Sequence, residues 1–209
     1  MIAGGGTGGH VCPAMAIAKE WLARASPEEG REVVLVGTQR GLEARLVPLA
    51  ELPFETLRVA GLKGKGGATL AKNLAMLFPA MSDAFRILRR HKPVAAFGVG
   101  GYAAGPMLLA AWLKGIPAVI FEPNAEPGFT NRVLARFAKL IVTAYEAPAK
   151  HWGAKAVVTG CPVRAEFFGA AARKPQRPFR VLITGGSQGA LPINRAFVDA
   201  VDRLAVRKN

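Results

Sequence analysis

Close to its N-terminus the chain reads Gly4-Gly5-Gly6-Thr7-Gly8-Gly9-His10 and then continues as an apolar helical stretch. Glycines allow positive φ angles and let a ligand approach the backbone closely. The first N–H groups of the following helix have no partner inside that helix, so they attract anions. Two related stretches follow, Gly98-Val99-Gly100-Gly101-Tyr102 and Gly185-Gly186-Ser187-Gln188-Gly189. Three strand–glycine–helix junctions of this kind predict a cleft for a phosphorylated or sugar-bearing substrate.

Around these glycine stretches, β-branched runs alternate with helical segments, which predicts an α/β fold with a doubly wound parallel sheet. The strands are expected at Glu32–Gly37, Val94–Gly98, Ala118–Glu122, Leu140–Thr143, Ala156–Thr159 and Arg180–Thr184. The helices are expected at Val11–Ala25, Leu42–Leu49, Leu70–His91, Gly105–Lys114, Asn131–Phe137 and Leu191–Val206. Ligands of such sheets bind beyond the carboxyl ends of the strands, where all three glycine stretches would lie.

Composition limits the possible classes of function. The net charge of +14 suits phosphorylated ligands or an anionic bilayer. The basic residues form no recognisable nucleic-acid module, so no nucleic-acid partner is expected. The two cysteines and three histidines are scattered, which predicts reduced thiols of a cytosolic protein, no metal site and no cofactor. Residues 94–113 are uncharged, but their glycines and Pro106 favour a buried strand and helix over a membrane span.

The chain also divides into regions by composition. A polar, proline-bearing stretch ends near residue 178 and has the character of a linker. We therefore expect an N-terminal domain over residues 1–164, a linker over 165–178 and the start of a second domain over 179–209. That last region is too short to fold alone. Since only three residues precede the first glycine stretch, the chain is expected to be a fragment, clipped slightly in front and heavily at its end.

His10 stands at the mouth of the first glycine stretch, beside the expected helix start. The partial positive charge there favours a neutral imidazole, which can accept a proton from a substrate hydroxyl as a general base. The alternative is a histidine that only caps or packs. The spacing Gly4-x-Gly6-x-x-Gly9 also matches the dinucleotide fingerprint, but the second strand lacks the acidic residue that this fingerprint requires. An NAD or FAD site is therefore disfavoured.

Two further segments have both a functional and a structural interpretation. Glu122 and Asn124 follow a buried strand and could bond sugar hydroxyls, whereas Thr130 or Asn131 could simply cap the next helix. The apolar stretch from Leu70 ends in a basic cluster around Arg89, and Pro79 should kink or split it. It is either an amphipathic core helix or a patch that docks on an anionic membrane.

In order along the whole chain, these motifs resemble the MurG-type N-acetylglucosaminyltransferases of peptidoglycan synthesis. The motifs are Ala3-Gly4-Gly5-Gly6-Thr7-Gly8-Gly9-His10-Val11, Gly61-Leu62-Lys63-Gly64-Lys65-Gly66, Gly98-Val99-Gly100-Gly101-Tyr102, Glu122-Pro123-Asn124 with Pro127-Gly128-Phe129-Thr130-Asn131, Pro162-Val163-Arg164, and Gly185-Gly186-Ser187-Gln188-Gly189-Ala190. The resemblance implies a GT-B architecture, in which two Rossmann-like domains face each other across a cleft. The chain would hold the first domain and the first β–α unit of the second.

The resemblance also implies an activity. Such enzymes transfer N-acetylglucosamine, with inversion, from UDP-N-acetylglucosamine to the 4-hydroxyl of MurNAc in undecaprenyl-pyrophosphoryl-MurNAc-pentapeptide, turning lipid I into lipid II without a metal. The implied place is the cytoplasmic side of the inner membrane, as a peripheral protein. The implied partners are both substrates, the anionic membrane surface and other cell-wall synthesis proteins. The 209-residue chain alone would be inactive, because the remaining donor contacts lie in the second domain.

The matching positions take their roles from the same resemblance. His10 would be the base, with Glu122 supporting the catalytic site. The implied substrate-binding residues are Thr7, Gly8, Gly9, Asn124, Arg164, Ser187, Gly100, Gly101 and Tyr102. The chain departs from the family where Phe121, Pro123 and Cys161 replace the usual His, Gln and Asn. Two other functions stay open: a related GT-B enzyme with a different acceptor, and a non-catalytic module that docks on membrane or on cell-wall assembly proteins.

Overall fold

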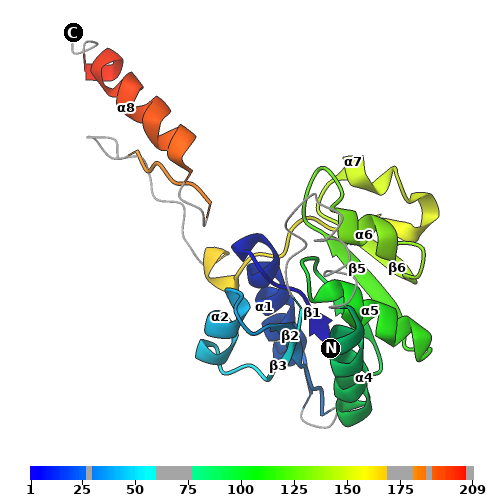
Figure 1. Ribbon diagram of the computed structural model, residues 1–209. Coiled ribbons are helices and arrows are strands. Elements are labelled where there is room, and N and C mark those ends of the chain that lie inside the picture. Colours follow the sequence, from blue (N-terminus) through cyan, green and yellow to red (C-terminus); the bar gives the residue numbers. More distant parts are fainter. Residues whose placement is uncertain (27–29, 60–76, 169–180, 187–189, 206–209) are drawn as a thin grey trace. The chain divides into compact units, whose positions relative to one another are not determined.

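The computed structural model describes residues 1–26, 30–59, 77–168, 181–186 and 190–205, and the chain forms two compact units, Met1–Phe168 and Gly169–Asn209. In the first unit the described residues form a seven-stranded, all-parallel sheet in the order β3-β2-β1-β4-β5-β6-β7 (Figure 1). The strands are β1 Ile2–Ala3, β2 Leu35–Thr38, β3 Phe54–Leu57, β4 Ala96–Gly98, β5 Ala118–Glu122, β6 Leu140–Thr143 and β7 Ala156–Val158. The predicted α/β fold with a parallel sheet is confirmed.

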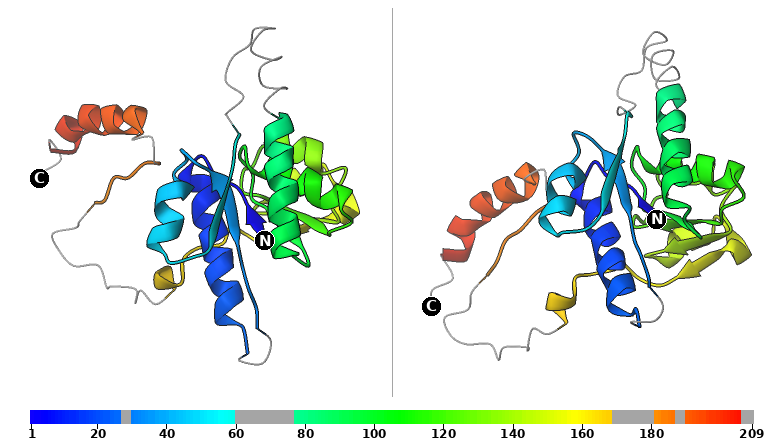
Figure 2. Two further views of the ribbon diagram at one scale, coloured as in Figure 1. Left: turned by 60° about the horizontal axis from the view of Figure 1, so that its bottom comes forward. Right: turned by 90° about the horizontal axis from the view of Figure 1, so that it is seen from below.

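Helices cover both faces of this sheet (Figures 1 and 2). Their bounds are α1 Gly8–Ala23, α2 Glu43–Leu49, α4 Leu77–His91, α5 Ala104–Leu113, α6 Phe129–Leu134 and α7 Glu146–Ala149. Successive strand residues point to opposite faces, which separates two hydrophobic clusters. Ile120 of β5 packs in the cluster with α4, α5 and α6, whereas its neighbour Phe121 packs in the cluster with α1 and α2. The strands are therefore apolar on both sides, as parallel sheets require.

The strand order reverses between β1 and β4. From β1 the chain builds outward through β2 and β3, and it then returns to the other side of β1 to add β4. Such a switch point opens a crevice at the carboxyl ends of the strands, because the two connections diverge there. The first glycine stretch leaves β1 at this point and the second leaves β4, so the topology brings two segments together that are about ninety residues apart.

Several sequence predictions need correction. Strand β3 was not predicted, since it is a half-exposed edge strand in which only Leu57 is buried. Helix α7 was missed because its four residues are too few for helical periodicity. Helix α6 begins at Phe129 with Gly128 as N-cap, so Thr130 and Asn131 are inside the helix and do not cap it.

The predicted helix Leu70–His91 is described only from Leu77, where α4 begins, so Pro79 lies in the first described turn and no break follows it. Residues 70–76, and the predicted motif at 61–66, lie outside the described residues. Across the described chain, no helix is long and apolar enough to cross a membrane.

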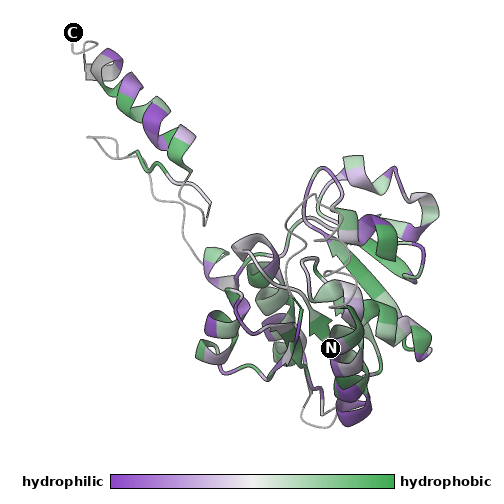
Figure 3. Ribbon diagram, in the orientation of Figure 1, coloured by the Kyte–Doolittle hydropathy of each residue, from purple (hydrophilic) through white to green (hydrophobic). Residues whose placement is uncertain are grey.

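The second unit contains helix α8, Leu191–Ala205, in which apolar and polar residues alternate at helical spacing (Figure 3). The described residues 181–186 form no strand, which contradicts the predicted strand Arg180–Thr184. A strand needs a neighbour to hydrogen-bond its backbone, and the described part of this unit offers none. The predicted division at residues 164 and 178 stays a prediction.

Candidate functional site

A cavity of about 240 Å³ lies at the carboxyl ends of β1, β4 and β5. Its lining includes seven residues that the sequence predicted as site residues, namely Thr7, His10, Gly100, Gly101, Tyr102, Glu122 and Asn124. Gly5, Gly6, Gly128, Phe129, Thr130 and Asn131 complete the wall. The glycine stretches after β1 and β4 and the loop after β5 thus meet around one space. This convergence follows from the strand order, because β1, β4 and β5 are adjacent in the sheet.

The first glycine stretch turns sharply and then starts α1. Gly6 has a φ of 93°, a conformation that glycine adopts without strain. Thr7 is the N-cap residue of α1, and its carbonyl accepts the N–H groups of His10 and Val11 at 3.1 Å each. The Thr7 side chain makes no capping hydrogen bond and is exposed. The start of this 16-residue helix therefore offers N–H groups and a hydroxyl to an anion or a sugar.

The second glycine stretch packs directly against the first. Gly100 and Gly101 have φ angles of 92° and 81°. A Cβ on Gly101 would overlap the carbonyl oxygen of Gly5, and a Cβ on Gly100 would lie 2.9 Å from Cε1 of His10. Side chains at either position would push the two loops apart. Gly101 is therefore required for the backbone contact with Gly5, and Gly100 for the contact with the His10 imidazole.

His10 sits half-buried where these loops meet. Its imidazole packs against Gly100, and its Nδ1 is buried with no hydrogen-bond partner among the described residues. The ring is therefore held by packing against the loop and by its place in the first turn of α1. A neutral imidazole held in this way can accept a proton at its other nitrogen, Nε2.

Glu122 is fully buried at the end of β5, and its carboxylate organises the loop that follows. One oxygen accepts the backbone N–H and the side-chain amide of Asn124, at 2.9 and 2.8 Å. The other accepts the N–H of Gly128 and the amide of Asn131, both at 2.9 Å. All four donors belong to the loop or to α6. Glu122 thus acts on the cavity by fixing Asn124, Gly128 and Asn131 in place.

Asn131 also lines this cavity, whereas the sequence offered it, with Thr130, only as one of two candidates for capping the next helix. It is 3% exposed and donates to the Phe121 carbonyl as well as to Glu122, while its Oδ1 is buried without a partner among the described residues. A buried acceptor left open in a cavity wall suits a ligand hydroxyl or N–H. Nothing in the local sequence separates this role from capping, since the contact with Glu122 spans nine residues.

Glu43 is a second buried carboxylate near the cavity, and the sequence did not predict its contact with the first glycine stretch. It lies in the first turn of α2, is 2% exposed, and accepts the N–H of Gly6 at 2.8 Å. The sequence predicted no role for Glu43. The available signal was the pair Gly37 and Gly41, since both glycines leave room for its side chain.

Other predicted site residues lie elsewhere. Gly8 and Gly9 form the first turn of α1 but do not line the cavity. Arg164 lies in the segment after β7 with its guanidinium 5.1 Å from the centre of the Phe167 ring, and it is also outside the cavity. Ser187 lies outside the described residues. Phe121, one of the departures from the family pattern, is buried in the core and adds nothing to the cavity surface.

Helix α4 carries a basic and apolar groove. Its wall contains the apolar side chains Phe78, Met81 and Phe85 together with the cations Arg86, Arg89, Lys92 and Lys114. Phe78 is 80% exposed and stands beside these cations, so the groove presents apolar and basic surface together. The acidic residues nearby are already paired. Hydrogen bonds from Arg58 hold the pKa of Asp83 below its usual range, and the hydrogen bond with His91 does the same for the pKa of Glu55.

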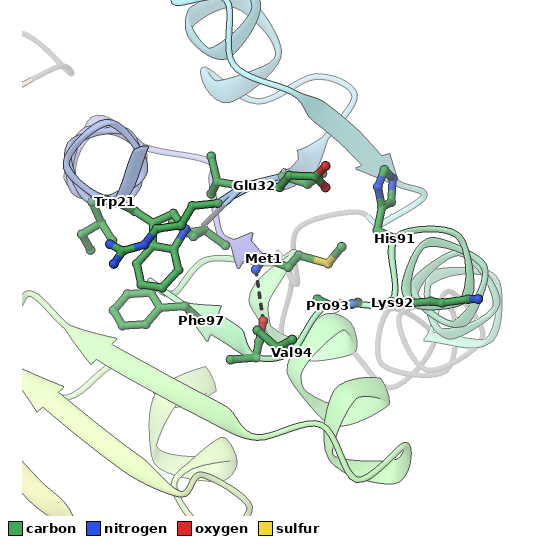
Figure 4. A pocket seen from close by; sticks show the side chains of 15 residues that line it. Met1, Trp21, Glu32, His91, Lys92, Pro93, Val94 and Phe97 are labelled. Carbon is green, nitrogen blue, oxygen red and sulfur yellow. Dashed lines mark hydrogen bonds between the residues drawn. The ribbon is translucent and has the colours of Figure 1, made fainter. Parts of the chain in front are cut away.

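A larger cavity of about 490 Å³ lies at the opposite edge of the sheet (Figure 4). It is lined mainly by segments that precede β1, β2 and β4, with Trp21 and Phe97 forming part of its apolar wall. Figure 4 also shows the N-terminal amine of Met1 donating to the Ala95 carbonyl at 3.1 Å. Because ligands of parallel sheets bind at the carboxyl edge, the smaller cavity around His10 is the candidate site.

The family of the chain follows from its similarity to known proteins. The model of the glycosyltransferase family 28 N-terminal domain matches residues 1–143. The chain belongs to glycosyltransferase family 28. All three described segments around the cavity, after β1, β4 and β5, fall within the matched residues.

Individual relatives and solved structures show which members of family 28 the chain is similar to. The chain is 47% identical over 209 residues to the UDP-N-acetylglucosamine–N-acetylmuramyl-(pentapeptide) pyrophosphoryl-undecaprenol N-acetylglucosamine transferase of an Anaeromyxobacter species, covering 98% of the chain and 54% of that protein. The identity to the Myxococcus xanthus transferase of the same name is 45%, covering 100% and 55%. The chain therefore spans little more than half the length of these relatives.

The crystal structure of Acinetobacter baumannii MurG matches with a TM-score of 0.63 at 34% identity, over 79% of this chain and 46% of that one. The resemblance to MurG seen in the sequence is confirmed. The UDP-GlcNAc 2-epimerase of Neisseria meningitidis shares only the fold, with a TM-score of 0.56 at 15% identity, over 77% of this chain and 45% of that one. Both likenesses support the predicted GT-B class.

Proposed function

We propose that this chain is the acceptor-side part of a family 28 glycosyltransferase that makes lipid II. The full-length enzyme transfers N-acetylglucosamine from UDP-N-acetylglucosamine to the 4-hydroxyl of MurNAc in lipid I. This proposal rests on the similarity, along the whole chain, to the N-acetylglucosamine transferases of Anaeromyxobacter and Myxococcus xanthus. The cavity supports this proposal, because His10, the amide side chains of Asn124 and Asn131, and the start of α1 meet there at one edge of the sheet.

His10 is the proposed general base. As the acceptor 4-hydroxyl oxygen attacks C1 of the donor sugar, Nε2 of the imidazole takes the hydroxyl proton, and the bond from C1 to the UDP oxygen breaks. UDP leaves with the bonding electrons, and the sugar configuration inverts from α to β. Asn124 and Asn131 offer amide groups to sugar hydroxyls, and Glu122 holds both amides in position. No step in this scheme requires a metal ion.

Anionic groups bind where backbone N–H groups are open. The start of α1 at Thr7, Gly8 and Gly9 is the proposed contact for a substrate phosphate. Gly100, Gly101 and Tyr102 form the proposed pocket for the acceptor pyrophosphate. Arg164 and Ser187 are the proposed contacts of the UDP moiety. The predicted linker at 165–178 leads, in this proposal, to a donor-binding domain that begins at residue 179, and the 209-residue chain alone transfers no sugar.

The groove on α4 is the proposed membrane contact. Exposed Phe78 and the neighbouring apolar side chains can enter the interfacial region, while Arg86, Arg89 and Lys92 lie at the level of anionic headgroups. In this proposal the site lies on the cytoplasmic face of the inner membrane, beside its lipid-linked acceptor. Sedimentation with vesicles of anionic phospholipid tests the contact. Phe78→Ser with Arg89→Gln should reduce binding at least tenfold, and unchanged binding would contradict the membrane contact.

The base assignment has its own test. In a full-length protein containing this chain, His10→Ala should lower kcat for sugar transfer by about 10²–10⁴-fold. His151→Ala is the matched control, because His151 is exposed and lies outside the cavity. Activity of the His10→Ala variant within threefold of the control would refute the role of His10 as base.

A further inference from the structure

Glu43 is a buried carboxylate that contacts the back of the first glycine stretch. Its Oε2 accepts the N–H of Gly6 at 2.8 Å. Its Oε1 accepts both the N–H and the hydroxyl of Thr38, also at 2.8 Å each. The side chain is 2% exposed and belongs to the first turn of α2, so one carboxylate joins α2, the end of β2 and the turn after β1.

Three glycines make room for this carboxylate. A Cβ on Gly5 or Gly41 would overlap the carboxylate of Glu43, and a Cβ on Gly37 would overlap its Cγ. Three segments of the fold therefore lack side chains at the points where they surround one acidic group. A loop that needed only flexibility would not require glycines in β2 and before α2 as well.

The position of the Gly5–Gly6 turn determines the position of the cavity wall. On its other side, the Gly5 carbonyl packs against Gly101. Helix α1 begins two residues after Gly6, and His10 lies in its first turn. The turn is thus fixed from behind by Glu43 and from the front by the second glycine stretch. A shift of Gly6 would move the α1 start and the imidazole together.

We propose that Glu43 is a positioning residue, which holds the Gly6 turn so that the α1 start and His10 face the substrates. The proposal rests on the proposed function for the reaction that it serves. Glu43 does not line the cavity, so in this proposal it acts on the site through the Gly6 turn. It also uses the Gly6 N–H itself, so the anion contacts of this loop come from the later N–H groups of Thr7, Gly8 and Gly9.

Glu43→Gln gives a sharp test because the two side chains have the same shape. The amide oxygen of the glutamine can keep both Thr38 hydrogen bonds, and its NH₂ group then faces the N–H of Gly6, donor against donor. The variant should fold, but the Gly6 turn should lose its anchor. Thr38→Val is the matched control, since it removes one hydrogen bond of the same carboxylate and leaves the Gly6 bond intact.

Two readouts separate this role from a general loss of structure. Amide hydrogen exchange, followed by NMR on the 209-residue chain, should show at least tenfold faster exchange at Gly6 in Glu43→Gln but not in Thr38→Val. In the full-length enzyme, kcat/KM for sugar transfer should fall at least tenfold in Glu43→Gln and less than threefold in Thr38→Val, at temperatures where both remain folded.

The possible outcomes are distinct. Unchanged Gly6 exchange in Glu43→Gln would overturn the anchoring role, as would faster exchange with unchanged kcat/KM. An equal loss of kcat/KM in both variants would also overturn it, because the effect would then not depend on the Gly6 bond. If the wild-type enzyme transfers no sugar, the proposed function fails, while the exchange result still reports on the anchor.

Discussion

Replacing Glu122 with Gln perturbs one fully buried carboxylate and leaves the size of the side chain unchanged. Each carboxylate oxygen accepts two N–H donors. The amide oxygen of glutamine can serve one pair, and its NH₂ group must then face the other pair, donor against donor. The variant therefore loses two hydrogen bonds and leaves the loop from Asn124 to Gly128, or its contact with α6, without an anchor.

The size of this effect depends on two opposing contributions. Hydrogen bonds to a charged group contribute about 1.5–3 kcal/mol each, so two lost bonds cost about 3–6 kcal/mol. Removing a buried charge recovers part of its desolvation cost. We expect a net loss of about 2–4 kcal/mol in the free energy of unfolding, because buried donors left unpaired outweigh that gain.

Urea denaturation of the purified chain, followed by tryptophan fluorescence and circular dichroism, measures this loss. Glu126→Gln is the matched control, because it makes the same chemical change on an exposed residue of the same loop. The control should stay within about 0.5 kcal/mol of wild type. If Glu122→Gln is as stable as the control, the four-donor arrangement around Glu122 is wrong.

Two further variants probe the fold and the cavity. Asp83 is buried and bonded to both the backbone and the side chain of Arg58. Because those bonds lower the pKa of Asp83, its contribution to stability is present above the usual carboxyl pKa of about 4 and is lost as pH falls. Asp83→Asn should lower the free energy of unfolding by about 1–2 kcal/mol near pH 7, a modest value because the Arg58 side chain is half exposed. A stability difference from wild type that is as large at pH 2 as at pH 7 would contradict this prediction. Gly100→Ala should lower the rate of sugar transfer at least tenfold, because its Cβ would press on His10. Gly115→Ala is the control, since Gly115 also has a positive φ but lies in open space, and this variant should keep the wild-type rate. Equal rates for the two variants would refute the contact between Gly100 and His10.

The sequence predicted the features that depend on local pattern. The strands Ala118–Glu122 and Leu140–Thr143 were placed at their observed bounds, because continuous apolar runs mark buried parallel strands. The glycine stretches after β1 and β4 correctly indicated where the carboxyl edge of the sheet lies. Edge strand β3 escaped prediction because its residues are only half-buried.

The roles of individual polar residues were less accessible to prediction. Asn131 and Glu43 hydrogen-bond to partners nine and thirty-seven residues away, so no local sequence pattern indicates these contacts. Glu122 was expected to support the site, and only the structure identifies the donors that it holds. Long-range hydrogen bonds of buried carboxylates are set by the topology of the fold.

The most direct test of the proposed function is the product of the reaction. A full-length protein containing this chain would be incubated with UDP-N-acetylglucosamine and a short-chain analogue of lipid I. Mass spectrometry and NMR of the product should show one added N-acetylglucosamine, joined by a β bond to the 4-oxygen of MurNAc, with release of UDP. A folded enzyme that leaves lipid I unchanged, or that joins the sugar at another position or with the α configuration, would contradict the proposed reaction.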